Sequence, residues 1–131
     1  MKKWQSGGKI KKNNIVRYKM DCIFCKIING DIPSKKVYED EVCYSFLDIN
    51  PQAKVHALIV PKKHIASVDG IDAGNSAVVA HIFEVIPSIA AELGLSGGYR
   101  VVTNIGEDGC QSVKHLHFHI LGGEKLSEDM A

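Results

Sequence analysis

No apolar run in this 131-residue sequence approaches the ~20 residues needed to cross a bilayer, so no membrane-spanning helix is predicted. Residues 1–19 also lack the apolar segment of a secretory signal. Cysteine is scarce, with four residues in all. Without a secretory segment, thiols are expected in a reducing compartment, where close pairs more often bind metal than form disulfides. We therefore expect a soluble, cytoplasmic protein, with the nucleus as a second compartment.

Acidic residues are absent from residues 1–19, which hold seven of the sixteen Lys and Arg. Residues 20–131 carry nine bases against fifteen acids, a net charge of −6, which disfavours binding to nucleic-acid phosphates. We expect residues 1–19 to be a basic, disordered extension and residues 20–131 to form one domain, with Met20 a candidate natural start. The extension is read as an inert arm; a membrane arm, a nucleic-acid arm and an organelle address stay open.

The sequence has no internal repeat, and its patterns predict few elements. A short helix is expected from Asp21, as N-cap, to Asn29, and a long helix over residues 75–93, kinked or divided by Pro87 and closed by Gly94. β-rich segments bounded by turn signals, the last of them strictly alternating, predict five strands, in residues 36–41, 42–49, 56–61, 99–104 and 115–121. Strands grouped in hairpins favour an α+β fold: a five-stranded antiparallel sheet with one long and one short helix on one face.

Residues 115–123, "HLHFHILGG", alternate three histidines with Leu116, Phe118 and Ile120. In a strand this pattern makes one face apolar and places the three imidazoles in a row at intervals of ~6.6 Å on the other. A single buried histidine is more often a core residue whose hydrogen bonds are satisfied. Three in register are different, because each ring needs a polar partner once it leaves water, so the row indicates a functional site.

Three segments, "QSVKHLHFHILGG", "FLDINPQAKVHALIVPKKHI" and "GYRVVTN", resemble the histidine triad (HIT) superfamily, in particular its nucleotide-binding phosphoramidase branch. The resemblance covers residues 22–123, so residues 20–131 are expected to be a HIT domain. It implies a hydrolase that cleaves the P–N bond of purine nucleoside 5′-phosphoramidates to AMP through a covalent nucleotidyl-histidine. It also implies a homodimer with a continuous ten-stranded sheet, a purine nucleotide substrate and no organic cofactor. No membrane or specific nucleic-acid partner is expected.

The resemblance assigns His117 as the nucleophile, with His119 and His56 flanking the phosphate and Ser112 and Asn104 on the leaving-group side. A neutral imidazole near pH 7 offers a lone pair without a separate base, provided that its other nitrogen stays protonated, for which a backbone carbonyl on the same strand is expected. By itself, Ser112 is more typical of a turn residue, but its place in "QSV" before the triad favours the functional role. The implied nucleotide-binding set is Asp48 and Ile49, Phe24, Ile27, Ile32 and Phe46, Asn104, Cys110, Gln111 and Ser112, and His117 and His119.

Within that set, Asp48 is implied to accept hydrogen bonds from the ribose hydroxyls, although an Asp before Asn50 and Pro51 is also a common turn residue. The apolar residues are implied to bind the base, but each alone is more typical of a core. For the Cys22–Cys25 pair, the resemblance implies a structural zinc site with His64 and His115. The alternative is two reduced cysteines that pack as small hydrophobic residues. Cys43 and Cys110 are expected to be a strand residue and a loop residue.

Two departures from the branch affect what can be carried over. Cys110 stands where a glycine is usual, and the C-terminus "GGEKLSEDMA" lacks the aromatic and proline-bearing end through which relatives contact the neighbouring subunit's site. Slower or redox-sensitive activity and altered substrate selectivity are the expected consequences. The alternatives are a dinucleoside polyphosphate hydrolase, a nucleotide-binding regulatory or scaffold protein with weak catalysis, and a small zinc-stabilised interaction module.

Overall fold

The computed structural model describes residues 21–129, in two compact units that meet in sequence between Pro33 and Ser34. The expected basic extension, residues 1–19, and Met20 lie outside the described residues, so the predicted boundary after residue 19 stays a prediction. Within residues 21–129, no helix has the length and apolar character needed to cross a membrane.

The described part of the first unit contains helix α2, Ile23–Ile28. The N-cap is Cys22, one residue later than the predicted Asp21, because Cys22 has the extended backbone of a cap and its Sγ accepts a hydrogen bond from the Cys25 amide at 3.5 Å. The helix ends at Asn29, as predicted, and Gly30 follows with φ +85°. The cap thus involves both cysteines of the CxxC pair.

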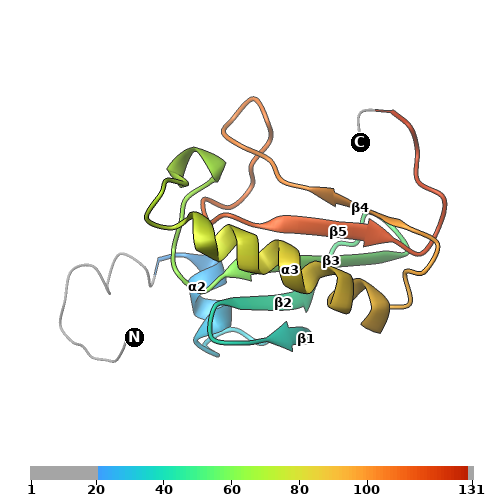
Figure 1. Ribbon diagram of the computed structural model, residues 1–131, viewed down its shortest axis with the longest axis horizontal. Helices are drawn as coiled ribbons and strands as arrows, with labels where there is room; N and C mark the ends of the chain where they lie inside the picture. The colour runs from blue at the N-terminus through green and yellow to red at the C-terminus, as the bar shows by residue number, and fades with distance from the viewer. Residues whose placement is uncertain (1–20, 130–131) are drawn as a thin grey trace. The chain divides into compact units, whose positions relative to one another are not determined.

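The second unit contains a five-stranded antiparallel sheet with the order β1-β2-β3-β5-β4, which confirms the predicted fold class (Figure 1). Its strands are β1 (Lys36–Glu39), β2 (Cys43–Leu47), β3 (Val55–Pro61), β4 (Tyr99–Val102) and β5 (Phe118–Gly122). β1 and β2 form the predicted hairpin, and Asp40 closes its turn by accepting hydrogen bonds from the Val42 and Cys43 amides at 2.8 and 2.9 Å. A short 3₁₀ helix, η1 (Val68–Gly70), was not predicted; three residues are too few for a periodic pattern.

Helix α3, Ser76–Glu92, lies across one face of this sheet (Figure 1). Of the two effects predicted for Pro87, division of the helix is wrong, because α3 continues through it, and a kink stays a prediction. Pro87 is on the exposed side, while Ile82, Ile86 and Ile89 bury the other side. The end at Gly94 is as predicted: Gly94 has φ +77°, and the Leu95 amide donates to the Ala90 carbonyl at 2.9 Å, which is a Schellman motif.

The predicted strand over residues 115–121 begins only at Phe118. The register between β3 and β5 runs from Val55 with Gly122 to Ile59 with Phe118. Beyond it, the Pro61 carbonyl accepts from the His115 side chain at 2.8 Å, and the Leu116 amide donates to the Ile65 carbonyl at 2.6 Å. A side chain therefore replaces a main-chain ladder bond, and His115–His117 leave the sheet while keeping their alternation.

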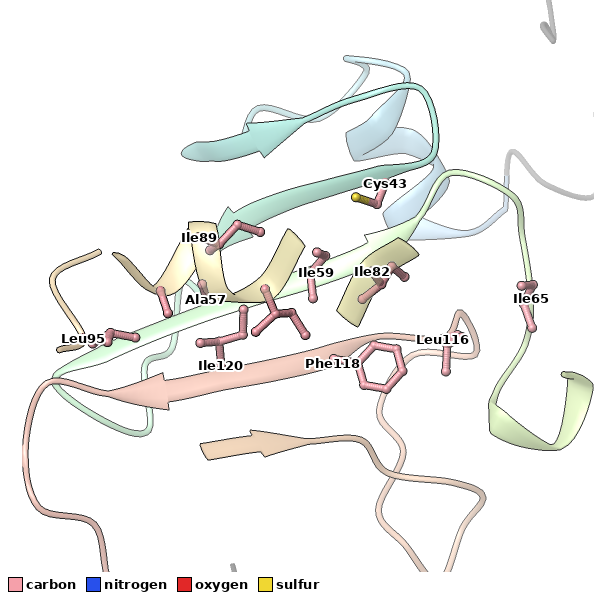
Figure 2. Close-up of a cluster of buried hydrophobic side chains, with 12 residues drawn as sticks. Cys43, Ala57, Ile59, Ile65, Ile82, Ile89, Leu95, Leu116, Phe118 and Ile120 are labelled. Atoms are coloured by element: carbon pink, nitrogen blue, oxygen red, sulfur yellow. The ribbon is translucent and has the colours of Figure 1, made fainter. Parts of the chain in front are cut away.

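The core of the second unit lies between α3 and the sheet (Figure 2). Leu116, Phe118 and Ile120, the apolar partners of the three histidines, are all buried there, as the alternation predicted. Ala57 and Ile59 of β3 and Ile82 and Ile89 of α3 complete this layer (Figure 2). Side chains that alternate with these residues along β3 and β5 point to the opposite face, where the candidate site is found.

Candidate active site

The face of the sheet opposite α3 brings together His56 from β3, His119 from β5 and His117 just before β5. His119 is paired with Leu58 across the β3–β5 ladder, so His56, two residues from Leu58, is its diagonal neighbour. The ring centroid of His119 lies 5.1 Å from that of His56 and also 5.1 Å from that of His117. The three predicted catalytic imidazoles are therefore contiguous, with His119 in the middle.

The tautomer of His117 follows from its main-chain contact. Its Nδ1 lies 2.7 Å from the carbonyl oxygen of His115, and a carbonyl oxygen only accepts, so Nδ1 carries the proton. This is the carbonyl contact expected from the sequence. The lone pair of a neutral His117 ring is then on Nε2. The hydroxyl of Thr103 donates to the His117 carbonyl at 2.8 Å and fixes the backbone on the other side.

One backbone amide sets the tautomer of His56, and His56 in turn sets the tautomer of His119. The Gln52 N–H donates to Nδ1 of His56 at 3.0 Å, so the proton of a neutral His56 is on Nε2. That Nε2 lies 2.9 Å from Nδ1 of His119, which must accept, so His119 carries its proton on Nε2. His117 and His119 thus have opposite tautomers: one has a lone pair on Nε2 and the other an N–H donor.

Burial favours the neutral form of His119 and His56. It lowers the pKa of His119 to about 4, with His117 and His56 contributing in the same direction and the Asp48 carboxylate opposing. Burial also lowers the pKa of His56, again against Asp48. Near pH 7 His119 and His56 are therefore uncharged, which suits hydrogen-bond donors more than a cationic patch.

Asp48 lies between β2 and β3 with its carboxylate directed to two partners. Oδ1 accepts from the Asn50 amide at 2.8 Å, which is the turn contact considered from the sequence. Oδ2 lies 3.5 Å from Nε2 of His56. The turn contact holds the carboxylate beside the histidines, so the turn role and a ligand-binding role are compatible. Ile49, next to it, is 91% exposed.

The apolar residues predicted to bind the base are divided between the two units. Phe46 is buried on β2 and Ile49 is exposed in the second unit. Phe24 and Ile27 on α2 and Ile32 after it belong to the first unit. Their assignment to the base stays a prediction.

The loop between β4 and β5 carries the other predicted ligand contacts. Asn104 is half-buried, Ser112 and Cys110 are exposed, and in residues 21–129 no hydrogen bond joins the Ser112 or Asn104 side chain to the histidines. Cys110 has φ +62°, the left-handed backbone that explains why a glycine is usual there. Gln111 uses its side-chain amide within the protein, on Gly106, Ala66 and Val113.

Two pairs of metal-ligating side chains match the predicted zinc set. In the first unit, Cys22 and Cys25 are joined by the helix cap. In the second, the rings of His64 and His115 meet edge to face with centroids 4.8 Å apart. The His115 Nε2–H donates to the Pro61 carbonyl, which places the lone pair of a neutral ring on Nδ1 and is the usual outer contact of a ligating histidine. Each pair thus offers atoms that zinc prefers as ligands, thiolate sulfur in the first unit and imidazole nitrogen in the second.

A match to a family model identifies the family of this chain. Residues 29–126 match the model of the HIT domain. The chain belongs to the HIT domain family.

Similar HIT proteins come from bacteria and a yeast. An uncharacterized HIT-like protein of Synechococcus elongatus is 47% identical over 82% of this chain and 94% of its own length. A structure of a HIT family hydrolase from Clostridium thermocellum is 43% identical, with a TM-score of 0.82, covering 85% of this chain and 97% of its own. A histidine triad nucleotide-binding protein from Candida albicans is 37% identical, with a TM-score of 0.70, covering 84% and 86%.

Two contributors to this HIT site were not found from the sequence. Thr103 ends the "YRVVT" run, and a hydroxyl directly before Asn104 was the only available signal. Gln52 acts through its main-chain amide, and every residue except proline carries such a group, so no sequence pattern indicates it. Both depend on which strands become neighbours.

Proposed function

We propose that this HIT protein is a nucleotide hydrolase that cleaves the P–N bond of purine nucleoside 5′-phosphoramidates to give AMP and an amine. The observation that carries the proposal is the pair of opposite tautomers on neighbouring rings. His117 presents a lone pair on Nε2 and His119 an N–H on Nε2, with centroids 5.1 Å apart. A nucleophile beside a neutral donor is the arrangement required for attack on a phosphorus whose non-bridging oxygens gain charge.

The reaction has two balanced steps. The Nε2 lone pair of His117 attacks the α-phosphorus, a P–N(His) bond forms, and the bond from phosphorus to the amine breaks as the amine nitrogen takes a proton from solvent through the Ser112 hydroxyl. Water then attacks the same phosphorus and the P–N(His) bond breaks. AMP leaves, and the second proton of the water passes to solvent. His117 Nδ1 keeps its proton, which the His115 carbonyl accepts in a hydrogen bond at 2.7 Å.

The other groups bind and orient the substrate. His119 donates from Nε2 to a non-bridging oxygen, and His56, whose two nitrogens are engaged by Gln52 and His119, acts through His119. Asp48 accepts from the ribose hydroxyls, and Asn104 lies on the amine side. The apolar side chains bind the base, and Ile49 is the one that is exposed for this contact. The nucleotide assignment is supported by the Candida albicans relative's name and the hydrolase assignment by that of the Clostridium thermocellum structure.

A structural zinc ion is part of the proposal, held by Cys22, Cys25, His64 and His115. Two thiolates and two imidazoles suit the tetrahedral preference of zinc, and the outer contact of His115 to Pro61 fits a ligating ring. The ion would cross-link the segments that carry these ligands, because all four of its coordination positions would be filled by side chains. The homodimer and the cytoplasmic location stay predictions.

The test is turnover of an adenosine 5′-phosphoramidate and of a diadenosine polyphosphate in parallel, with detection of a covalent AMP adduct by mass spectrometry after acid-free quenching. We expect preferential cleavage of the phosphoramidate, and a loss of more than about 10³-fold in kcat with His117→Asn. Preferential cleavage of the polyphosphate would instead indicate a dinucleoside polyphosphate hydrolase. AMP binding without turnover of either substrate would indicate a regulatory nucleotide-binding protein.

A further inference from the structure

We propose that Gln111 is a positioning residue that holds the Ser112 loop in place for the leaving amine, and that it does not contact the nucleotide. The proposal rests on the proposed function in one respect: Ser112 is taken as the leaving-group contact. It replaces the expectation, drawn from resemblance, that Gln111 belongs to the nucleotide-binding set.

The side-chain amide of Gln111 is committed to three main-chain groups. Its Nε2 donates to the Ala66 carbonyl at 2.7 Å and to the Val113 carbonyl at 2.9 Å. Its Oε1 accepts from the Gly106 amide at 3.1 Å. Both N–H donors and one oxygen lone pair are therefore used within the protein. A substrate oxygen could therefore bind this amide only by displacing one of these two carbonyl oxygens from Nε2.

These partners also fix the identity and the orientation of the side chain. Two carbonyl oxygens only accept and an amide N–H only donates, so the side-chain amide has one orientation that satisfies all three. Glutamate has the same size but would set a carboxylate against the two carbonyls. Asparagine is shorter by one methylene and does not span the same distance. Only glutamine both fits and satisfies this arrangement.

The loop that Gln111 closes is tight. The Gln111 amide donates to the Gly106 carbonyl at 3.0 Å, so residues 106 and 111 are joined by two hydrogen bonds, one from the main chain and one to the side chain. A Cβ on Gly109 would lie 2.4 Å from the Ile105 carbonyl oxygen, and Cys110 has φ +62°. Such a loop stores backbone strain, and the bonds of Gln111 offset it directly before Ser112.

Gln111 also links this loop to the segment after β3. Ala66 follows Ile65, whose carbonyl accepts the Leu116 amide, and His64, whose ring contacts His115. The residues before β5 are outside the sheet ladder, so these contacts define where His115–His117 lie. Gln111 thus sets the position of Ser112 relative to the segment that ends in the nucleophile. A misplacement of about 1 Å at such a group lowers turnover by about 10²-fold.

The experiment compares Gln111→Ala and Gln111→Glu with Asp108→Ala, an exposed side chain on the same loop. Turnover of adenosine 5′-phosphoramidate, the Kd for AMP by calorimetry and amide hydrogen exchange are measured for each. We expect kcat to fall about 10- to 100-fold in both Gln111 variants, with the Kd for AMP changed less than threefold. Exchange should accelerate in residues 105–113 and 64–66. Asp108→Ala should match the parent protein in all three measurements.

A double-mutant cycle with Ser112→Ala separates positioning from general loosening. If Gln111 acts through Ser112, Gln111→Ala in a Ser112→Ala background lowers kcat by less than threefold further. Multiplicative losses, or a Kd for AMP raised more than tenfold with kcat retained, would overturn the proposal. If the parent protein does not cleave the phosphoramidate, the proposed function is wrong, but amide hydrogen exchange still tests whether Gln111 holds the loop. Unchanged exchange in Gln111→Ala would refute the positioning role of Gln111.

Discussion

The Nε2 of His56 and the Nδ1 of His119 lie 2.9 Å apart, and the direction of this hydrogen bond is set by the Gln52 amide on the far side of His56. His119 therefore carries its proton where a phosphate oxygen would receive it. One main-chain amide thus decides the proton positions on both His56 and His119.

Replacing His56 with Phe removes the donor to Nδ1 of His119 and releases the tautomer of that ring. We expect kcat for the phosphoramidate to fall about 10²-fold, the usual effect of losing one oriented donor near developing charge. Nitrogen-15 NMR of the imidazoles should show His119 changing from the Nε2–H tautomer to a mixture. His81→Gln, a histidine substitution outside this site, should leave the rate within threefold. A His119 spectrum identical in parent and His56→Phe would contradict the relay.

The depressed pKa of His119 predicts how stability depends on pH. An unfolded histidine titrates near 6.5, whereas burial holds the folded pKa at about 4, so between these values the unfolded chain binds more protons. The free energy of unfolding should therefore be highest above pH 6.5 and decrease as the pH falls toward 4. Urea unfolding at pH 7, 6, 5 and 4.5 measures this slope. His119→Gln should flatten it; an unchanged slope in that variant would refute the assignment.

A second pH effect is expected from Asp40 at lower pH. His81 and Tyr38 donate to its Oδ2 at 2.6 and 2.7 Å, and these bonds with the Val42 and Cys43 amides hold the pKa of Asp40 well below its usual range despite desolvation. Its contribution is present above the unfolded pKa and lost as the pH falls below about 4. Asp40→Ala should cost about 2–4 kcal/mol at pH 7 by chemical denaturation. Glu41→Ala, exposed in the same turn, should cost less than about 0.5 kcal/mol.

The thiol pair provides the test of the metal proposal. Protein purified after zinc-replete growth should contain close to one zinc ion per chain by plasma mass spectrometry, and Cys25→Ser should lose most of it. Chelation should lower the melting temperature of the parent protein and have little effect on that variant. Cys110→Ser, an exposed thiol outside the donor set, is the control and should retain the metal. A metal content below about one-third in the parent protein would count against a structural zinc site.

Gly94 and Gly97 offer a matched pair at the end of α3. Neither position has a heavy atom within 4 Å of an added Cβ, but only Gly94 has a positive φ, at +77°. Gly94→Ala should therefore lower the free energy of unfolding by about 1 kcal/mol through backbone strain alone. Gly97→Ala should change it by less than about 0.5 kcal/mol. Equal effects of the two substitutions in urea unfolding would contradict the Schellman assignment.

Several features of this HIT domain could be predicted from the sequence because they depend on local periodicity. The alternation of residues 115–120 predicted an apolar and a histidine-bearing face, and the structure buries Leu116, Phe118 and Ile120 against α3. The hairpin at Asp40 and the helix end at Gly94 carry their own turn signals. The carbonyl contact of His117 was also predicted, because a neutral nucleophilic ring needs its other nitrogen held protonated, although His115 and His117 lie before β5.

Only the tertiary structure decided the features that depend on which segments become neighbours. Pro87 stays within α3 because buried isoleucines on both sides of it hold the helix against the sheet. The triad segment leaves the ladder before Phe118 because His115 takes the Pro61 carbonyl, 54 positions away in the chain. The proton positions on His56 and His119 follow from Gln52, and the role of Gln111 follows from Ala66. Sequence periodicity reports which face a side chain occupies, but a hydrogen-bond partner is defined only when distant segments are brought within about 3 Å.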